Sequence, residues 1–442
     1  MAPAQVTDSA VLGPARHVRR RAVLLGAAGN LAANFDGAIF AYLAPVLAQA
    51  FYPDQLQGVA LLLTLASYAT GFLMKPLGAI LFGTVGDRLG RKPSLYLSIA
   101  LMAVSSCIVT VLPDYATMGF AAPVLLVLAR LLEGISAGGE YGIASAYLVE
   151  FAPRTRRAYV SSSQQVTMMA GTLLASGVAT LLTSTLREHD LLSWGWRLPF
   201  AAGTVLCVVT AVLRSRVAET PSFTKIERAS TKTSHPVWNT LRQYPLASLR
   251  AVALSAAGIV VYHVWLQFLP TFAHSTTGIG LHTAQLANTA CLAVMLPLIP
   301  ACAKLSDRFG RRPTMLVFAV GMGVLAYPLL LALHLDIAGF LIAQLGGTVL
   351  LSFNYANESA VKAELFPTQV RAVGLSFPYA LAGAVFGSIS PLLTGYFANT
   401  GDSLPFALCI SATCLLPTLV LLRMPETKSC SLETNPRADT SC

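Results

Sequence analysis

The sequence predicts an all-α, polytopic membrane protein with twelve transmembrane helices. Hydrophobic residues make up 55% of its 442 residues and charged residues only 11%, whereas about a quarter of the residues in a soluble domain are charged. The mean hydropathy is +0.64, and apolar runs of about 20 residues, enough to cross a bilayer as a helix, recur along the chain. Three pairs of similar motifs divide the chain into two related halves. Together these observations predict two six-helix bundles.

The first half contains six predicted spans. The basic segment ARHVRRR at 15–21 resembles the front of a signal peptide, but the apolar run after it is too long for one. The charged stretch GDRLGRKP at 86–93 separates the second span from the third, and the fourth becomes polar at its end. The six predicted spans are 22–49, 56–83, 94–112, 120–148, 158–185 and 196–214.

The second half repeats this pattern after a polar linker. Residues 215–247 are rich in Ser, Thr, Lys and Arg and contain three prolines, which predicts a cytoplasmic linker with a short amphipathic helix around 221–229. The six predicted spans that follow are 248–273, 283–304, 314–333, 337–361, 371–398 and 404–423. The expected domains are a tail at 1–21, a bundle at 22–214, the linker at 215–247, a second bundle at 248–423 and a tail at 424–442.

Three motif pairs indicate that one half duplicates the other. GDRLGRKP at 86–93 matches SDRFGRRP at 306–313, with the two aspartates 220 positions apart. EFAPRTRR at 150–157 matches ELFPTQVR at 364–371, and RVAET at 216–220 matches RMPET at 423–427, at offsets of 214 and 207. Two related bundles joined by a linker are typical of transporters that rock one half against the other to alternate access.

The net charge of +10 does not require a nucleic acid as partner. With both termini inside the cell, most Lys and Arg residues fall in the tails, the linker and the loops on that side, as the positive-inside rule expects. This predicts a plasma membrane protein, in a bacterium the inner membrane, with both termini cytoplasmic. Six of the eight cysteines lie in predicted spans and two in the second tail, so neither a disulfide nor a metal site is predicted.

Several stretches give the sequence a family resemblance. Gly83 to Lys92 resembles the loop 2–3 signature of the major facilitator superfamily, although the second copy has Ala303 in place of the first glycine. The chain further resembles the metabolite:proton symporters, which carry citrate, 2-oxoglutarate, shikimate, proline or betaine. The stretches concerned are GN at 29–30 with Phe35–Asp36, KPLGAILFG at 75–83, RLLEGISAGGEYG at 130–142, WGWRLPF at 194–200, ETPSF at 219–223 and ELFPTQVRAVG at 364–374.

The chain departs from that family at three positions. The family usually has Glu at the position of Ala33, Gln at that of Glu133 and Arg at that of Lys75. A carboxylate expected on the first span is therefore missing, and another appears on the fourth.

Asp36 is a candidate for proton coupling because it lies near the middle of the first span, far in sequence from any basic residue. A carboxyl group buried there must pair with a cation on another helix or take up a proton. Asp36 is thus predicted to carry a proton or to alternate between partners. The alternative is a permanently paired acid with a structural role.

Arg130 and Glu133 lie three residues apart in the fourth span and therefore share one helical face, which Tyr141 continues. A guanidinium near the membrane midplane can bind a substrate carboxylate in a two-pronged contact. Glu133 would hold Arg130 in the empty state and release it on protonation. A static pair that only fixes helix packing is the alternative.

Other polar residues within the spans are weaker candidates. Lys75 precedes Pro76 and either contacts the substrate or Asp36, or extends toward the inner surface. His263 could exchange a proton near neutral pH, but a lone histidine is more often a packing residue. The remaining predicted substrate-binding residues are Asn30, Gln165, Tyr262, Gln267 and Tyr379.

The repeated charged motifs predict a gate on the cytoplasmic side. Asp87 is expected to meet an arginine such as Arg157, or a helix N-terminus, across the bundle, and the second copy is expected to latch the other half. Glu358 is predicted to act in the gate rather than on the substrate. The full predicted set is Gly83, Asp87, Arg88, Gly90, Arg91, Lys92, Glu150, Arg157, Asp307, Arg308, Gly310, Arg311, Arg312, Glu358, Glu364 and Arg371.

The sequence thus favours a secondary active symporter that brings a small carboxylate-bearing or zwitterionic metabolite inward with protons, as a monomer in the lipid bilayer. The alternative is a proton antiporter that exports a drug or secondary metabolite. Such exporters tend to carry GPxxGG in the fifth span, which here reads TMMAGTLLASGVATLL at 167–182. A nutrient sensor on this fold would usually add a long soluble tail, whereas about twenty residues follow the last predicted span here. No nucleophile elbow, metal triad or phosphate loop indicates an enzyme, and no cofactor is predicted.

Overall fold

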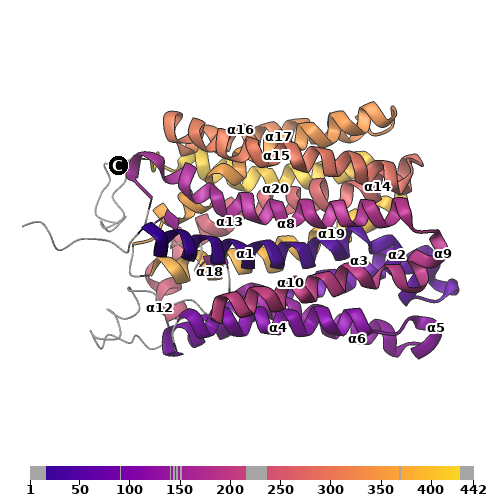
Figure 1. Cartoon of the computed structure of the whole chain (residues 1–442). Helices are drawn as coiled ribbons and strands as arrows, with labels where there is room; N and C mark the ends of the chain where they lie inside the picture. Colours follow the sequence, from indigo (N-terminus) through magenta and orange to yellow (C-terminus); the bar gives the residue numbers. More distant parts are fainter. Residues whose placement is uncertain are drawn as a thin grey trace, which may run out of the picture.

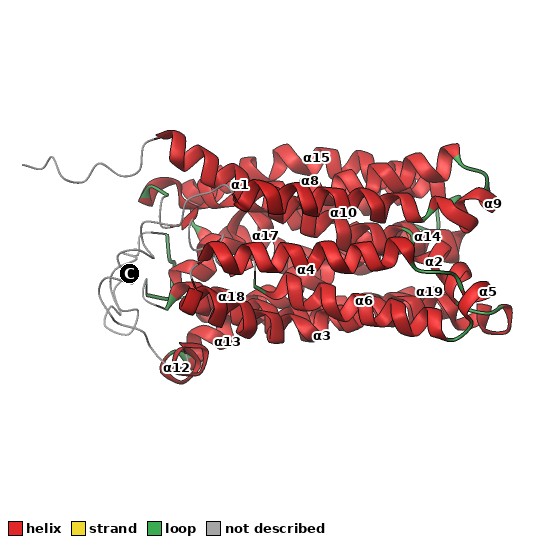
Figure 2. Ribbon diagram, turned by 60° about the horizontal axis from the view of Figure 1, so that its bottom comes forward, coloured by secondary structure: helices red, strands yellow, loops and turns green. Residues whose placement is uncertain are grey.

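In the computed structural model, all regular structure within the described residues is helical, and the long helices run side by side (Figures 1 and 2). The structure describes residues 16–89, 91–139, 141–142, 145, 148–149, 152–215, 236–367 and 370–428, with side chains except at 16–28, 54, 57, 86–92, 154, 214, 236 and 372. Ten helices in these ranges are long and apolar enough to span a membrane, and two bent pairs raise the number to twelve.

The first half supplies six of these spans. A bend of 64° separates α1 from α2. Pro45 lies in the first turn of α2. The elements are α1 (Arg16–Tyr42), α2 (Ala44–Phe51), η1 (Asp54–Leu56), α3 (Gln57–Leu89), α4 (Arg91–Val111), α5 (Tyr115–Met118), α6 (Ala121–Gly138), η2 (Arg154–Arg156), α8 (Arg157–Thr185), α9 (Glu188–Asp190), η3 (Leu191–Gly195) and α10 (Arg197–Ser215).

The second half supplies the other six. Two of its spans contain a π-helical turn, η4 and η5, a local widening that is frequent at functional sites. The elements are α12 (Pro236–Gln243), α13 (Pro245–Val261), η4 (Tyr262–Phe268), α14 (Leu269–Thr277), α15 (Leu281–Phe309), α16 (Arg311–Ala332), α17 (Ile337–Glu364), α18 (Arg371–Ala382), η5 (Gly383–Gly387), α19 (Ser388–Thr400) and α20 (Ser403–Arg423).

The predicted spans correspond to these helices with shifted bounds. The predicted span 22–49 is bent into α1 and α2, and the sixth span begins earlier, with the bent pair Glu188–Gly195 and Arg197–Leu213. The seventh span begins at Pro245 inside the predicted linker, which also contains α12. The amphipathic helix predicted at 221–229 and the stretch at 216–220 lie outside the described residues.

The bundle has two distinct ends, visible in Figures 1 and 2. The linker end holds α12, the N-terminus of α8 at Arg157 and the C-terminus of α15 at Phe309. The far end holds α2, α5 and α9. The two halves pack against each other along α8 with α15 and α17, and along α3 with α19, so any path through the protein runs between these helices.

Glycines bring α3 and α6 into backbone contact beside this path. A Cβ added to Gly134 would lie 1.8 Å from the carbonyl oxygen of Gly71, and one added to Gly138 would lie 2.0 Å from that of Lys75. No side chain fits at such a distance. The close approach fixes α3 and α6, and with them Lys75 and Arg130, in one relative position.

Candidate functional site

Two adjacent cavities of ≈ 80 and ≈ 110 Å³, which share several wall residues, lie between the halves. Both are lined by Asn34, Lys75, Tyr262 and His263. The first, the central cavity, is also lined by Arg130, Glu133, Tyr68, Phe72 and Gln267. The second, the linker-side cavity, is also lined by Asn30, Tyr141, Tyr355, Glu358 and Tyr379. Nearly all the residues that the sequence predicts for substrate and proton therefore converge on one space.

Arg130 is a buried cation with unused donors in the wall of the central cavity. Its Nη1 makes an ion pair with Oε2 of Glu133, one turn along the same helix. Its Cζ lies 4.6 Å from the centroid of the Phe40 ring. Nε and Nη2 have no hydrogen-bond partner among the described residues. Because buried donors are rarely left unsatisfied, this guanidinium is suited to an incoming acceptor.

Asp36 lies behind this ion pair and is fully buried. Its Oδ1 accepts a hydrogen bond from the Ser106 hydroxyl at 2.6 Å, whereas Oδ2 has no partner among the described residues. Asp36 interacts electrostatically with both Arg130 and Glu133. Helices α1, α4 and α6 thus gather two carboxyl groups around one guanidinium.

Lys75 points into the protein rather than toward lipid or a membrane surface. It lines both cavities, and its Nζ lies 3.9 Å from the centroid of the Phe72 ring. It also interacts electrostatically with Glu133. The structure therefore places Lys75 beside Arg130 as a second cation of the central cavity.

The second half contributes a polar chain from the π-helical turn η4. The Gln267 amide donates to the Tyr262 hydroxyl at 3.1 Å and accepts from the Tyr68 hydroxyl of the other half at 3.2 Å. The hydroxyls of Tyr262 and Thr172 are 3.0 Å apart. His263 lines both cavities, with Nδ1 2.7 Å from the carbonyl oxygen of Ile259 on its own helix. These contacts join the two halves across the cavity.

The linker-side cavity ends at a second buried charge pair, between Glu358 and Lys362 of α17. The Gln165 amide of α8 donates to Oε2 of Glu358 at 2.8 Å. The rings of Tyr141 and Tyr379, one from each half, stack with centroids 3.8 Å apart. Glu358, predicted for the gate, thus lies in the cavity wall while also holding a contact between the halves.

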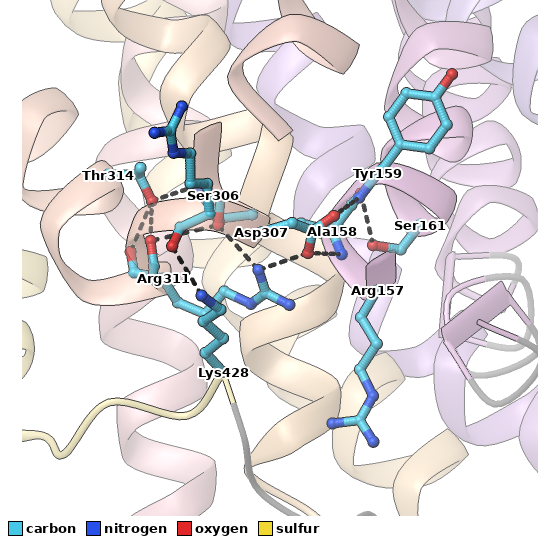
Figure 3. A network of polar contacts seen from close by, with 12 residues as sticks. Arg157, Ala158, Tyr159, Ser161, Ser306, Asp307, Arg311, Thr314 and Lys428 are labelled. Atoms are coloured by element: carbon cyan, nitrogen blue, oxygen red, sulfur yellow. Dashed lines mark hydrogen bonds and ion pairs between the residues drawn. The ribbon is translucent and has the colours of Figure 1, made fainter. Parts of the chain in front are cut away.

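A polar network at the linker end connects the halves through the second copy of the repeated motif (Figure 3). Asp307 accepts hydrogen bonds from the backbone N–H groups of Ala158 and Tyr159, at the N-terminus of α8, at 3.1 and 3.0 Å. It also pairs with Arg311 at 2.8 Å. An anion is stabilised at a helix N-terminus, where the backbone N–H groups lack intrahelical partners. Asp307 of the second copy therefore makes a helix N-terminus contact of the kind that was expected of Asp87, whose own side chain lies outside the described residues.

Two other acidic residues complete this end. Glu364 lies 3.5 Å from Arg157 and 3.8 Å from Arg311. Glu426 of the RMPET motif accepts from the backbone N–H groups of Arg311 and Arg312 at 2.8 and 3.0 Å, and so caps α16. Each motif of the second half therefore contributes one carboxylate to the linker end.

Replacing Asp307 with Asn is expected to open the linker end. The carboxylate makes hydrogen bonds worth roughly 1.5–3 kcal/mol each between the halves. Cys302 is buried in one apolar cluster with Ala158 at this interface. In a protein that keeps Cys302 as its only cysteine, we expect maleimide to label the Asp307→Asn variant about tenfold faster, following the shift in population.

The matched control is Asp336→Asn, because Asp336 caps α17 through Gly339 and is exposed. An unchanged labelling rate in Asp307→Asn would show that Asp307 does not hold this end closed.

Not all predicted gate residues have described side chains. Gly90 and Glu150 lie outside the described residues, as do the side chains of Asp87, Arg88, Arg91 and Lys92.

The remaining predicted gate residues have described surroundings. The space around Gly83 is open, and Gly310 has a φ of 111°, which suits glycine. Arg371 is buried and donates to the carbonyl groups of Ala363 and Phe366. The Arg308 carbonyl accepts from Lys428, and the Arg312 guanidinium donates to the Leu422 carbonyl.

A neutral network on the far-end side of the cavity has no counterpart among the predictions. The Tyr42 hydroxyl donates to the Leu266 carbonyl of η4 at 2.5 Å. Gln285 donates to the Tyr42 carbonyl at 2.9 Å, and Asn288 to the Tyr42 hydroxyl at 3.2 Å. Contacts between the halves therefore lie on both sides of the cavity. Uncharged polar residues are common in membrane helices, so only the structure distinguishes these.

Sequence comparisons place the chain among transporters. Residues 22–285 match the family described as "Sugar (and other) transporter", and residues 275–440 match "Major Facilitator Superfamily". The alpha-ketoglutarate permease of Escherichia coli (strain K12) is 34% identical over 427 residues, which cover 96% of this chain and 98% of the permease. The citrate-proton symporter of Klebsiella pneumoniae is 31% identical over 424 residues, covering 93% and 94%.

A solved structure has the same fold. The xylose transporter XylE from E. coli, in a partially occluded inward open conformation, aligns with a TM-score of 0.73 at 19% identity, over 93% of this chain and 99% of that one. With its twelve spans, its duplicated motifs and a cavity between the two halves, the chain belongs to the major facilitator superfamily of membrane transporters.

Proposed function

We propose that this transporter carries a small carboxylate-bearing metabolite inward together with protons. The central cavity would face each side of the membrane in turn as the two halves rock. The observation that carries the proposal is the buried Arg130, whose unused Nε and Nη2 donors lie in a cavity that also receives Lys75. A planar guanidinium of this kind matches a carboxylate in geometry and charge.

Asp36 and Glu133 are the proposed proton carriers. Two carboxylates that interact inside a membrane protein repel each other, and one proton on either of them removes the repulsion. When Glu133 takes up this proton, its hold on Arg130 weakens and the guanidinium becomes available to the substrate. Proton and carboxylate thus enter by an exchange of partners at Arg130.

The charges around the cavities agree with this coupling. Three basic and three acidic side chains belong to this region. Lys75, Arg130, Glu133 and Glu358 line the two cavities, and Asp36 and Lys362 interact with lining residues from behind. With all six charged the set is neutral, and one bound proton makes it positive by one charge. Because uncompensated charge inside the membrane is unfavourable, the proton favours binding of an anion and the anion favours binding of the proton.

The names of the relatives support both parts of the proposal. The E. coli relative is named for alpha-ketoglutarate and the K. pneumoniae relative for citrate and protons, and both substrates are carboxylates. For orientation, we propose that the linker end faces the cytoplasm, because the predicted inside loops carry most Lys and Arg residues. In this orientation both termini would lie in the cytoplasm, and we propose that the protein acts as a monomer in a bacterial inner membrane.

Replacing Glu133 with Gln tests the coupling. The amide keeps the shape of the side chain but cannot carry the exchanged proton. In proteoliposomes, we expect proton-driven accumulation of 2-oxoglutarate or citrate to fall at least about tenfold, while exchange of labelled for unlabelled acid continues, because exchange needs binding but no net proton movement. Asp36→Asn should behave in the same way.

Exposed acids provide matched controls, Glu188→Gln and Asp402→Asn, which should leave both activities unchanged. Full accumulation by Glu133→Gln and Asp36→Asn would rule out these carboxyl groups as proton carriers. The antiporter would be favoured if none of a panel of organic acids moved protons into the proteoliposomes while a drug or aromatic metabolite drove protons in the opposite direction.

A further inference from the structure

Lys362 is a buried cation behind the wall of the linker-side cavity, where it contacts the lining residues Glu358, Tyr141 and Tyr379, and sequence patterns do not reveal it. It is 2% exposed, and its Nζ lies 2.9 Å from Oε1 of Glu358 and 3.2 Å from the hydroxyl of Ser255. The same Nζ lies 4.8 Å from the centroid of the Tyr141 ring and 4.4 Å from that of the Tyr379 ring. A carboxylate, a hydroxyl and two aromatic rings therefore surround the ammonium group.

These surroundings are those of a binding site for a cationic ligand. Carboxylates and tyrosine rings are groups with which proteins bind ammonium ligands. Here the two rings stack on each other and the ammonium group lies beside the stacked pair, next to Glu358; we call Glu358, Ser255, Tyr141 and Tyr379 together the cage. Three of the groups concerned, Tyr141, Tyr379 and Glu358, also line the linker-side cavity. The cage is thus part of the proposed transport space, and a side chain of the protein itself occupies it.

Lys362 and Arg130 differ in whether their nitrogen atoms remain available to bind a ligand. The ammonium of Lys362 contacts Glu358, Ser255 and both rings, whereas Nε and Nη2 of Arg130 have no hydrogen-bond partner in the part of the chain that the structure describes. Oε2 of Glu358 is taken as well, by the amide of Gln165. Lys362 therefore fills a cation site, while Arg130 offers an anion site.

Neither of the other two described acids in this region, Glu133 and Asp36, offers a replacement site for a cation. Glu133 is paired with Arg130, and Asp36 accepts from Ser106 and interacts with Arg130. A substrate ammonium would have to displace Lys362 from Glu358 or compete with Arg130. Either exchange would strand a basic side chain in the membrane interior, which is unfavourable.

We propose that Lys362 determines specificity by occupying the cation site of the cavity, so that the transporter takes carboxylates without an ammonium group and excludes betaines. This inference rests on the proposed function, since it assumes that the cavity binds the carboxylate of a substrate. It narrows the substrate class to organic acids with no positive charge.

The experiment compares uptake into proteoliposomes of 2-oxoglutarate with that of glycine betaine and γ-butyrobetaine, which differ in the spacing of carboxylate and trimethylammonium. Wild type should accumulate the acid, and neither betaine should inhibit that uptake. Lys362→Ala vacates the cage but keeps Glu358 and both rings. We expect this variant to take up at least one betaine about tenfold faster than wild type. A tenfold ratio corresponds to about 1.4 kcal/mol of binding free energy.

Two further variants isolate the cage. Lys304→Ala removes a lysine that also lies over a tyrosine ring, that of Tyr159, but is exposed and away from the cavity, and it should gain no betaine uptake. Lys362→Ala/Glu358→Gln keeps the rings but lacks the carboxylate, so the gain should disappear.

The two proposals fail in different ways. Uptake of betaine by wild type as fast as 2-oxoglutarate would overturn the role of Lys362 while leaving carboxylate transport intact. So would a folded Lys362→Ala variant that gains no betaine uptake. If wild type moves neither acids nor betaines, the proposed function itself fails. The competition measurement on wild type needs no variant, so the proposal stays testable even if Lys362→Ala does not fold.

Discussion

Arg130→Gln is expected to abolish binding of the carboxylate substrate. The guanidinium supplies the unused donors of the central cavity and the cation that Asp36 and Glu133 share. Removing one partner of a buried, hydrogen-bonded charge pair costs about 2–5 kcal/mol, so affinity should fall by about thirtyfold or more. Isothermal titration of the purified protein with 2-oxoglutarate and citrate measures the change directly.

Arg130→Lys separates charge from geometry. Lysine retains the charge but not the planar fork, so we expect an intermediate loss, of about tenfold. Arg242→Gln is the matched control, since Arg242 is exposed on α12. Size-exclusion chromatography shows whether each variant is folded. A folded Arg130→Gln variant with the affinity of wild type would show that the substrate binds elsewhere.

Gly134→Ala is expected to disrupt both the fold and transport. The new Cβ would lie 1.8 Å from the Gly71 carbonyl oxygen. The oxygen is a backbone atom and the position of a Cβ is fixed by the backbone, so no side-chain rotation can relieve the overlap. Helices α3 and α6 must separate, at a cost of about 1–3 kcal/mol or more for overpacking. The separation moves Lys75 away from Arg130, so thermal stability and acid uptake should fall together.

Gly177→Ala is the matched control, because no atom lies within 4 Å of the added Cβ and the residue is also helical. Alanine is preferred over glycine in a helix by roughly 1 kcal/mol, so this variant should be as stable as wild type or more so. The melting temperatures of both variants, read from intrinsic fluorescence in detergent, provide the comparison. Equal melting temperatures would show that α3 and α6 tolerate a wider spacing.

The helices and their pairing into halves could be predicted because membrane spans are long apolar runs and because the two halves repeat the same charged motifs. The face shared by Arg130 and Glu133 follows from their spacing of three residues. The bend between α1 and α2 was not predicted, although Pro45 at the start of α2 is a signal for it. The π-helical turn η4 has no comparable signal.

Contacts between helices limit what one sequence can show. Ser106 of α4 meets Asp36 of α1, and a polar residue of this type is ordinary in a membrane helix. Lys362 lies one residue past the predicted tenth span, where lysines usually reach the membrane surface. Its burial depends on Tyr141, Ser255 and Tyr379, which come from three distant segments, so only the fold reveals it.

The central claim is that one carboxylate substrate and protons cross together through the cavity that Arg130 and Glu133 line, with Asp36 behind them. The most direct measurement is the pH inside proteoliposomes of wild-type protein when 2-oxoglutarate or citrate is added outside without any other gradient. Our account predicts that the lumen becomes more acidic as the acid enters, and that Glu133→Gln abolishes this signal. Acid entry with no change of lumenal pH, or with a rise, would contradict it.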